Sequence, residues 1–425
     1  MTEDYRPMWT DLGLDLDAHD ALLSILGQAY QDIYLSQKNR PEQMAYFDFV
    51  MNEVHGLRIK ELLDEKSAGR KIIGSYCVFV PEEIVLAANA TLVGLCSGAD
   101  FAMEAVDTLL PRSTCALIKS AFGFKLGKVC PFLESADMIV GENTCDGKKK
   151  AYEIMGSLVD NLYVMDLPQV KSANGRELLK AEYMRFKSAV EKLTGVTISA
   201  DTLQKGIQTV NAKRAALHRL SSLRRTDPSP ISGLDALLVN QVSFYDNPDR
   251  FTTSVNKICD ELEQRLKNRA GVVPVNTPRI LVSGCPQAVP NWKLPQLVET
   301  SGGIIVGEES CVGERGVRNL TADTGQTVEE MMENIVDRYF RIDCAIFTPN
   351  PDRLDHIRKM VSEYKADGVI HYGLQFCQPY LMESMPVETA LKKENIPCLR
   401  VETDYSAEDL GQLKTRIEAF IEQLR

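Results

Sequence analysis

Residues 71–95, KIIGSYCVFVPEEIVLAANATLVGL, decide the fold class of this chain. The two short apolar runs at its ends, KIIGSY and ATLVGL, are typical of buried parallel strands. Between them, Pro81 followed by Glu82 and Glu83 marks the start of a helix. A strand, a helix and a second strand in this order predict a parallel sheet covered by helices.

The same alternation recurs in both halves of the chain. ADMIVG (136–141) and NLYVMDL (161–167) extend the first set of strands, and a second set of short apolar runs begins at residue 279. These later runs are RILVSG (279–284), GGIIVG (302–307), CAIFTP (344–349), GVIHYG (368–373) and PCLRVET (397–403). We therefore predict an α/β protein with two doubly wound, Rossmann- or flavodoxin-like parallel-sheet domains, the second approximately duplicating the first.

Two helical regions accompany the predicted sheets. Residues 1–68 place apolar residues at intervals of three and four, which predicts an N-terminal helical cap. Residues 171–272 contain three helical patterns, with Asn247 as a cap, Pro248 as a first helical residue and Gly271 as a stop. We predict four parts: the cap (1–68), the first α/β domain (69–170), a helical linker domain (171–272) and the second α/β domain (273–425).

Composition excludes several classes of function. The chain has 425 residues, a net charge of -11 and no basic stripe interleaved with aromatic residues, so we expect no nucleic-acid binding. No stretch approaches the roughly 18 apolar residues of a membrane span. The acidic start, MTEDYRPMWTDLGLDLDAHD, lacks the basic and apolar regions of a secretory signal. We expect a soluble cytoplasmic protein.

The eleven cysteines are the unusual feature of the composition. An odd number in a reducing compartment favours metal or redox chemistry over disulfides. Five of them directly follow predicted strands, where open parallel sheets bind their ligands: Cys77, Cys145, Cys285, Cys311 and Cys377. Cys115, beyond a helix break at Pro111, could reach the same crevice from a loop.

Six thiolates that converge from two domains could hold iron–sulfur clusters. Helix N-termini at these loops would favour an anionic cluster. Glycines near the strand ends would let the backbone approach closely, although each is also an ordinary turn residue. These glycines are Gly74, Gly141, Gly284, Gly307 and Gly373.

The alternative for any single cysteine is a small residue of the apolar core. We adopt that interpretation for Cys259, Cys344 and Cys398, and leave the roles of Cys96 and Cys130 open, since Cys96 also ends a predicted strand. There is no CxxC pair, so a structural zinc site is disfavoured.

Several motifs resemble the 2-hydroxyacyl-CoA dehydratase and benzoyl-CoA reductase superfamily from about residue 40 to the end. They are SYCVFVPEEIVLAANA, STCALIKSAFG and VIHYGLQFC, followed by VETDY and TRIEAF. The resemblance implies two α/β domains, a helical part and a [4Fe-4S] cluster held by the cysteines that match Cys77, Cys115 and Cys377.

The chain departs from a plain dehydratase subunit by three further cysteines, in ENTCDGKKKAYE, VSGCPQAVPNWK and GEESCVGERG. In this it is similar to double-cubane cluster proteins, in which two [4Fe-4S] cubanes share a bridging sulfide. The resemblance assigns Cys77, Cys115 and Cys377 to one cubane, and Cys145, Cys285 and Cys311 to the other. A single [4Fe-4S] cluster is the alternative cofactor.

The resemblance also implies a homodimer and a separate ATP-hydrolysing iron–sulfur activator that supplies low-potential electrons. The chain itself has no G-x-x-x-x-G-K-[ST] loop; its nearest run, GFKLGKV (123–129), has the wrong spacing. The implied activity is reduction of a small molecule, with acetylene, azide or hydrazine as artificial substrates.

A proton donor near such a cluster would come from polar residues that flank the cysteines. The candidates are His371, Glu142, Glu308, Glu309 and Gln375, although a polar residue beside a strand end is more often a solvated loop or cap residue.

Two other functions are open from the sequence. The first is a subunit of a 2-hydroxyacyl-CoA dehydratase or benzoyl-CoA reductase type enzyme with one [4Fe-4S] cluster. The second is a cluster carrier or binding protein without catalysis, because pairs of doubly wound domains also form ligand clamps.

Overall fold

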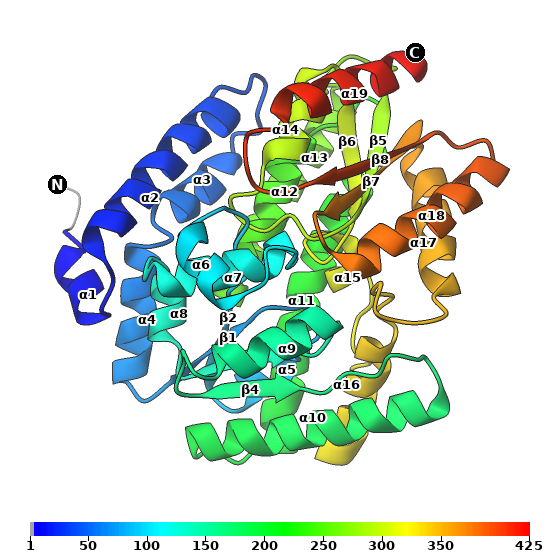
Figure 1. Cartoon of the computed structure of the whole chain (residues 1–425). Helices are drawn as coiled ribbons and strands as arrows, with labels where there is room; N and C mark the ends of the chain where they lie inside the picture. The colour runs from blue at the N-terminus through cyan, green and yellow to red at the C-terminus, as the bar shows by residue number, and fades with distance from the viewer. Residues whose placement is uncertain (1–3) are drawn as a thin grey trace.

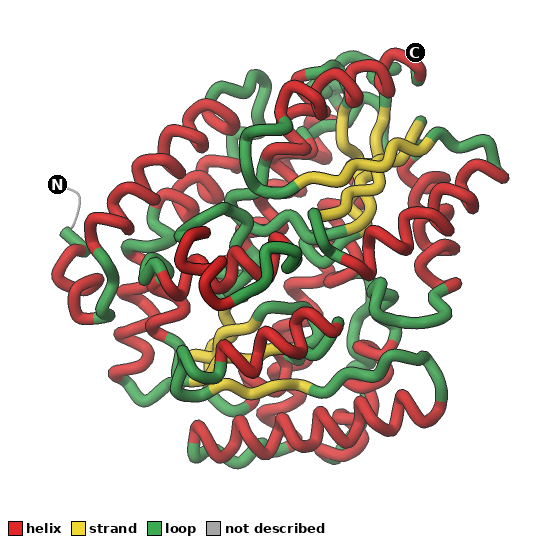
Figure 2. Tube along the Cα trace, viewed as in Figure 1, coloured by secondary structure: helices red, strands yellow, loops and turns green. Residues whose placement is uncertain are grey.

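The computed structural model describes residues 4–425 and contains two separate parallel sheets (Figures 1 and 2). The first sheet has the order β2-β1-β3-β4 and the second β6-β5-β7-β8. The first consists of β1 (Lys71–Ser75), β2 (Ala90–Gly94), β3 (Met138–Glu142) and β4 (Leu162–Met165). The second consists of β5 (Arg279–Gly284), β6 (Ile304–Glu309), β7 (Gly368–Leu374) and β8 (Cys398–Thr403). The predicted α/β class and the approximate duplication are confirmed.

In each sheet the chain adds its second strand on one side of the first strand and its third on the other side. The strand order therefore reverses between β1 and β3 in the first sheet and between β5 and β7 in the second. β1 pairs in parallel with β2 and β3, with Ile73 opposite Leu92 and Met138. β5, β6 and β7 are buried along their whole length, whereas the edge strands β4 and β8 are partly exposed. Burial on both faces explains why the central strands read as apolar runs.

Helices connect the parallel strands and cover the two sheets. In the first half these are α5 (Glu82–Ala87), α6 (Met103–Leu109), α7 (Ala116–Leu126), α8 (Pro131–Ser135) and α9 (Asp146–Met155). In the second half they are α14 (Lys293–Thr300), α15 (Glu314–Val317), α16 (Val328–Phe340), α17 (Pro351–Tyr364), α18 (Gln378–Lys393) and α19 (Leu410–Gln423). Figure 1 shows the first sheet in the lower half of the view and the second at the upper right.

The expected N-terminal cap is helical over its described part; residues 1–3 lie outside the described residues. It consists of α1 (Arg6–Asp11), α2 (Leu16–Tyr30), the π-helical turn η1 (Gln31–Leu35), α3 (Met44–Asn52) and α4 (Leu57–Ser67). The side chain of Asp15 caps α2 by accepting a hydrogen bond from the Ala18 N–H.

The region between the sheets contains four helices rather than the three predicted. They are α10 (Ala173–Thr194), α11 (Ala200–Leu223), α12 (Gly233–Val242) and α13 (Pro248–Lys267). Asn247 caps α13 and Pro248 is its first residue, as predicted. The helix ends at Lys267 instead of continuing to Gly271, because Arg269, with a φ of +54°, leaves the helical backbone directly after the C-cap residue Asn268. All ten residues of α12 are buried, so this helix shows no polar face.

One predicted strand is wrong. CAIFTP (344–349) forms no strand but a loop after α16, and Ile346 and Phe347 pack into the core beside the first sheet. Apolar runs of this length do not distinguish a strand from a buried loop. Within residues 4–425, no helix is long and apolar enough to cross a membrane.

Candidate functional site

A cavity of about 370 Å³ lies between the two sheets, at the carboxyl ends of their strands. The six predicted cysteines all line it: Cys77, Cys115, Cys145, Cys285, Cys311 and Cys377. Cys96 and Cys344 line it as well. The prediction that dispersed thiols share one interdomain crevice therefore agrees with the geometry.

The first half of the chain places its cysteines by strand ends and helix starts. Cys77 follows β1, and Cys145 follows β3 as the N-cap of α9. The Lys148 N–H donates to Cys145 Sγ at 3.5 Å. Cys115 is the N-cap of α7, and the following Ala116 N–H donates to the carbonyl of Gln375 across the cavity. This last bond ties the two halves together beside the thiols.

The second half repeats this placement. Cys285 follows β5 directly, and its sulfur accepts a hydrogen bond from the Leu374 N–H at 3.4 Å. Cys377 is the N-cap of α18, and Cys311 follows β6. Three of the predicted cysteines thus occupy the N-cap positions of the helices α7, α9 and α18. The partial positive charge of these helix N-termini favours an anionic ligand in the cavity.

Some of the cavity cysteines lie close enough together that their thiols shift one another's pKa. Hydrogen bonding with Cys311 raises the pKa of the Cys77 thiol, and the same contact, aided by the charge of Arg315, lowers the pKa of Cys311 to about 6. Hydrogen bonding with Cys377 raises the pKa of Cys115. The Cys77–Cys311 contact joins cysteines assigned to different cubanes, whereas Cys115 and Cys377 are assigned to the same one. The assignment of cysteines to two cubanes stays a prediction.

Of the five remaining cysteines, two line the cavity and three do not. Cys344 is buried as predicted, yet it also faces the cavity, because the loop 344–349 that replaces the predicted strand brings it there. Cys96 donates from Sγ to the carbonyl of Tyr76 at 2.8 Å. Cys130, Cys259 and Cys398 are not among the residues that line the cavity.

The candidate proton donors lie outside the cavity wall. His371 lies in β7 and lines a different cleft, with Arg400 and Arg416. Glu308 is buried in a bidentate ion pair with Arg224 at 2.6 Å, and Gln375 is exposed.

Glu142 lies behind the cavity wall and is buried in an ion pair with Lys148, whose Nζ is 3.3 Å away. Burial raises the pKa of Glu142. Lys148 itself lines the cavity and was not predicted. Its position three residues after Cys145, in the first turn of α9, was the available signal.

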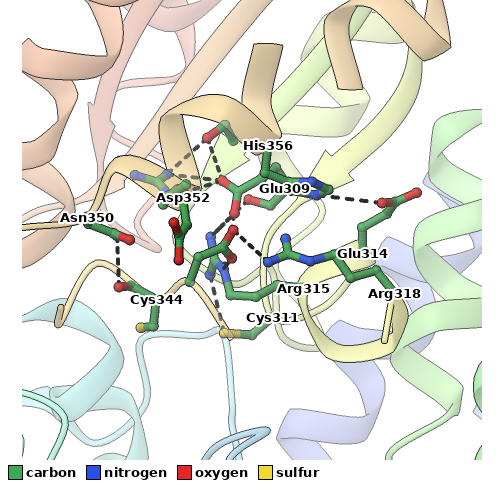
Figure 3. A network of polar contacts seen from close by, with 12 residues as sticks. Glu309, Cys311, Glu314, Arg315, Arg318, Cys344, Asn350, Asp352 and His356 are labelled. Atoms are coloured by element: carbon green, nitrogen blue, oxygen red, sulfur yellow. Dashed lines mark hydrogen bonds and ion pairs between the residues drawn. The ribbon is translucent and has the colours of Figure 1, made fainter. Parts of the chain in front are cut away.

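A buried network of charged side chains adjoins Cys311 (Figure 3). Its central residue is Glu309, which binds Arg315 through Oε1 and Arg353 through Oε2. Arg315 donates to Cys311 Sγ at 3.4 Å. Glu309 thus supports an arginine rather than facing the cavity itself. Among residues 4–425, no group of three or more His, Cys, Asp or Glu side chains forms a binding site for a single metal ion.

The fold and the site together define a class: an α/β protein with two parallel sheets and a cavity between them walled by thiols. The chain belongs to the 2-hydroxyglutaryl-CoA dehydratase D-component family, whose sequence model matches residues 77–424. The predicted superfamily is confirmed.

Curated relatives cover most of the chain. YjiM of Escherichia coli (strain K12), named provisionally as a dehydratase subunit, is 38% identical over 85% of this chain and 94% of its own length. The (R)-phenyllactyl-CoA dehydratase beta subunit of Clostridium sporogenes is 26% identical over 84% of this chain and 93% of its own length. A subunit of the benzoyl-CoA reductase of Thauera aromatica is 23% identical over 82% and 89%, respectively. The chain is therefore similar to subunits of both dehydratases and a reductase.

Proposed function

We propose that this chain is a cytoplasmic iron–sulfur reductase that holds a double-cubane cluster and reduces a small molecule with electrons from an ATP-hydrolysing iron–sulfur activator. A homodimer is part of the proposal. The observation that carries it is the meeting of six predicted cysteines, from both sheets, in one cavity. A subunit with one [4Fe-4S] cluster requires fewer thiols than this.

The chemistry of the cavity fits such a group. Thiolates are the ligands that iron–sulfur clusters prefer, and the helix N-termini behind Cys115, Cys145 and Cys377 favour its negative charge. When bound, an iron–sulfur cluster of this kind stores electrons at low potential and passes them on. The residues that would hold it are Cys77, Cys115, Cys145, Cys285, Cys311 and Cys377.

Other side chains of the cavity would shape access and proton supply. Leu117, Ile118 and Ile154 are among the apolar residues that line it, so the thiols share their cavity with apolar side chains. Lys148 holds its proton at Nζ beside Glu142, because burial, which lowers its pKa, is outweighed by neighbouring Tyr152 and Glu142. This pair places a protonated ammonium group with its counter-ion beside the thiols.

The size of the cavity supports a small substrate. Pockets for drug-sized ligands occupy about 300–1,000 Å³. The cavity, at about 370 Å³, lies near the lower end of that range before any cofactor is counted. A long acyl-CoA thioester would have to extend well outside it.

A second function is favoured by the relatives, which are named as dehydratase and reductase subunits. In that case the chain is a subunit of a 2-hydroxyacyl-CoA dehydratase or benzoyl-CoA reductase type enzyme. One [4Fe-4S] cluster would then be held by Cys77, Cys115 and Cys377, with a dissimilar partner subunit.

Counting iron separates these functions. The protein is purified without oxygen, and iron and acid-labile sulfide are measured per chain. About eight irons support the double cubane and about four the single cluster. Cys145→Ser should lower the iron content, whereas the matched variant Cys398→Ser, at the start of β8 and away from the cavity, should keep it. Unchanged iron in Cys145→Ser would overturn the six-ligand proposal, and clusters that leave readily, without turnover with the activator, would point to a carrier.

A further inference from the structure

Arg315 places a buried positive charge against one of the cavity thiols. It lies in the short helix α15, four residues after Cys311, and its Nη1 donates to Cys311 Sγ at 3.4 Å (Figure 3). The side chain is completely buried. By contrast, the sulfurs of Cys145 and Cys285 accept hydrogen bonds from backbone N–H groups, of Lys148 and Leu374. Cys311 thus has a charged donor.

Several contacts fix the guanidinium of Arg315 in this position. Its Nε and Nη2 donate to Glu309 Oε1, the former at 3.1 Å, and Nη2 also donates to the Glu309 carbonyl at 3.2 Å. Nη1 additionally donates to the Tyr380 hydroxyl, and the guanidinium carbon lies 5.4 Å from the centroid of the Tyr380 ring. A buried arginine needs such partners, and they leave it little freedom to turn away from Cys311.

The two carboxylates that balance the charge of Arg315, Glu309 and Asp343, also pair with other arginines. Glu309 Oε2 binds Arg353 at 3.1 Å and accepts from the Ser283 hydroxyl at 2.7 Å. Asp343, at 3.9 Å from Arg315, is itself paired with Arg318 at 2.6 Å. Because both carboxylates divide their charge between two guanidiniums, the positive charge nearest the Cys311 sulfur is only partly offset.

We infer that Arg315 is a positioning residue that raises the reduction potential of the metal group held by Cys311; this rests on the proposed function. A positive charge and a hydrogen bond at a ligand sulfur stabilise the state that carries the additional electron. Glu309 opposes this effect by neutralising part of the charge. The pair Glu309–Arg315 therefore sets the potential at one end of the cavity.

Two substitutions should move the potential in opposite directions. Arg315→Gln removes the charge and should make the midpoint potential more negative than in the wild type. Glu309→Gln keeps the shape but releases the charge of Arg315, and should make it more positive. The matched control is Arg318→Gln, because Arg318 binds Asp343 in the same network, while its second hydrogen bond goes to the Arg341 carbonyl, away from the thiols. The midpoint is measured by potentiometric titration followed by electron paramagnetic resonance, with iron content determined for each variant.

The outcomes separate this inference from the proposed function. If the wild type binds no iron, the proposed function fails. If it binds iron and both variants of the pair keep the wild-type midpoint, or shift it in the same direction, the inference alone is overturned. A shift in Arg318→Gln as large as that in Arg315→Gln would also overturn it. Should Arg315→Gln fail to fold, the positive shift of Glu309→Gln decides the question.

Discussion

Cys77 and Cys311 follow strands of different sheets, yet their thiols meet in one cavity and each shifts the pKa of the other. Cys77 follows β1 of the first sheet, and Cys311 follows β6 of the second. A ligand held by this pair would bind both domains at once, so it should stabilise their contact by linkage.

Substitution of the cavity cysteines should distinguish those that bind iron from those that only line the cavity. Cys77→Ser and Cys311→Ser should each lower the iron content, since each removes a thiolate donor. Cys96→Ser should retain it, because the Cys96 thiol already donates to the Tyr76 carbonyl. Iron and labile sulfide per chain provide the measurement. Equal iron loss in Cys344→Ser and Cys311→Ser would show that the ligand set extends to Cys344.

Gly284→Ala should disturb both stability and the position of Cys285. Gly284 has a φ of +137°, and an added Cβ would lie 2.0 Å from the carbonyl oxygen of Tyr372 in the neighbouring strand β7. The strand must shift, and Cys285 shifts with it. We expect a lower denaturation midpoint and lower iron content.

The control for this glycine is Gly27→Ala. Gly27 lies exposed in α2, and an added Cβ would meet nothing within 4 Å. Alanine there should be neutral or should stabilise by about 0.5–1 kcal/mol. A Gly284→Ala variant as stable and iron-rich as Gly27→Ala would contradict the prediction.

Glu308→Gln should cost stability rather than act on proton supply. Glu308 is the buried partner of Arg224, with both guanidinium nitrogens at 2.6 Å, and the variant leaves the arginine charge buried without its counter-ion. A loss of about 3–5 kcal/mol in the free energy of unfolding is expected. Glu388→Gln, in an exposed pair with Arg400, should change it by less than about 1 kcal/mol. Chemical denaturation measures both, and comparable losses in the two variants would be inconsistent with this account.

The N-terminal cap should weaken in mild acid. His19 Nε2 lies 2.9 Å from His55 Nδ1, so one ring donates and the other accepts. Burial lowers the pKa of His19 from 6.5 to about 4 and that of His55 to about 3. Below about pH 6.5 the unfolded chain therefore binds protons that the folded chain excludes, and stability is lost as the pH falls.

His19→Gln should reduce this pH dependence between pH 7 and pH 5. A difference on the order of 1–2 kcal/mol from the wild type is expected over that interval. His218→Gln is the control, since His218 is exposed on α11. Denaturation midpoints at the two pH values supply the comparison, and the same pH dependence in wild type and His19→Gln would refute the role of the pair.

Most of the fold could be predicted because the central strands are buried on both faces and separated by helix starts. The run CAIFTP was wrongly predicted as a strand. Its apolar side chains fill the core from a loop, and a buried loop can have the same composition as a buried strand. The number of helices between the sheets was too low by one, and a helix such as α12, buried on all sides, shows little of the amphipathic pattern that reveals a helix.

The cavity thiols could be predicted from position, since a cysteine after a parallel strand faces the crevice. The position of Cys344 in the cavity could not be predicted, because an irregular loop rather than a strand end places it there. Arg315 could not be assigned either: its contact with Cys311 depends on Glu309 and Tyr380, and the latter is 65 residues away in sequence.

The six predicted cysteines span residues 77 to 377, and the last of them stands at the N-cap position of α18. A nascent polypeptide emerging from the ribosome thus exposes the earlier thiols long before the final one is synthesised. Any inorganic group that needs the complete set must be inserted after translation has passed α18. Occupation of the full six-thiol site would therefore follow synthesis of both sheets rather than accompany synthesis of the first.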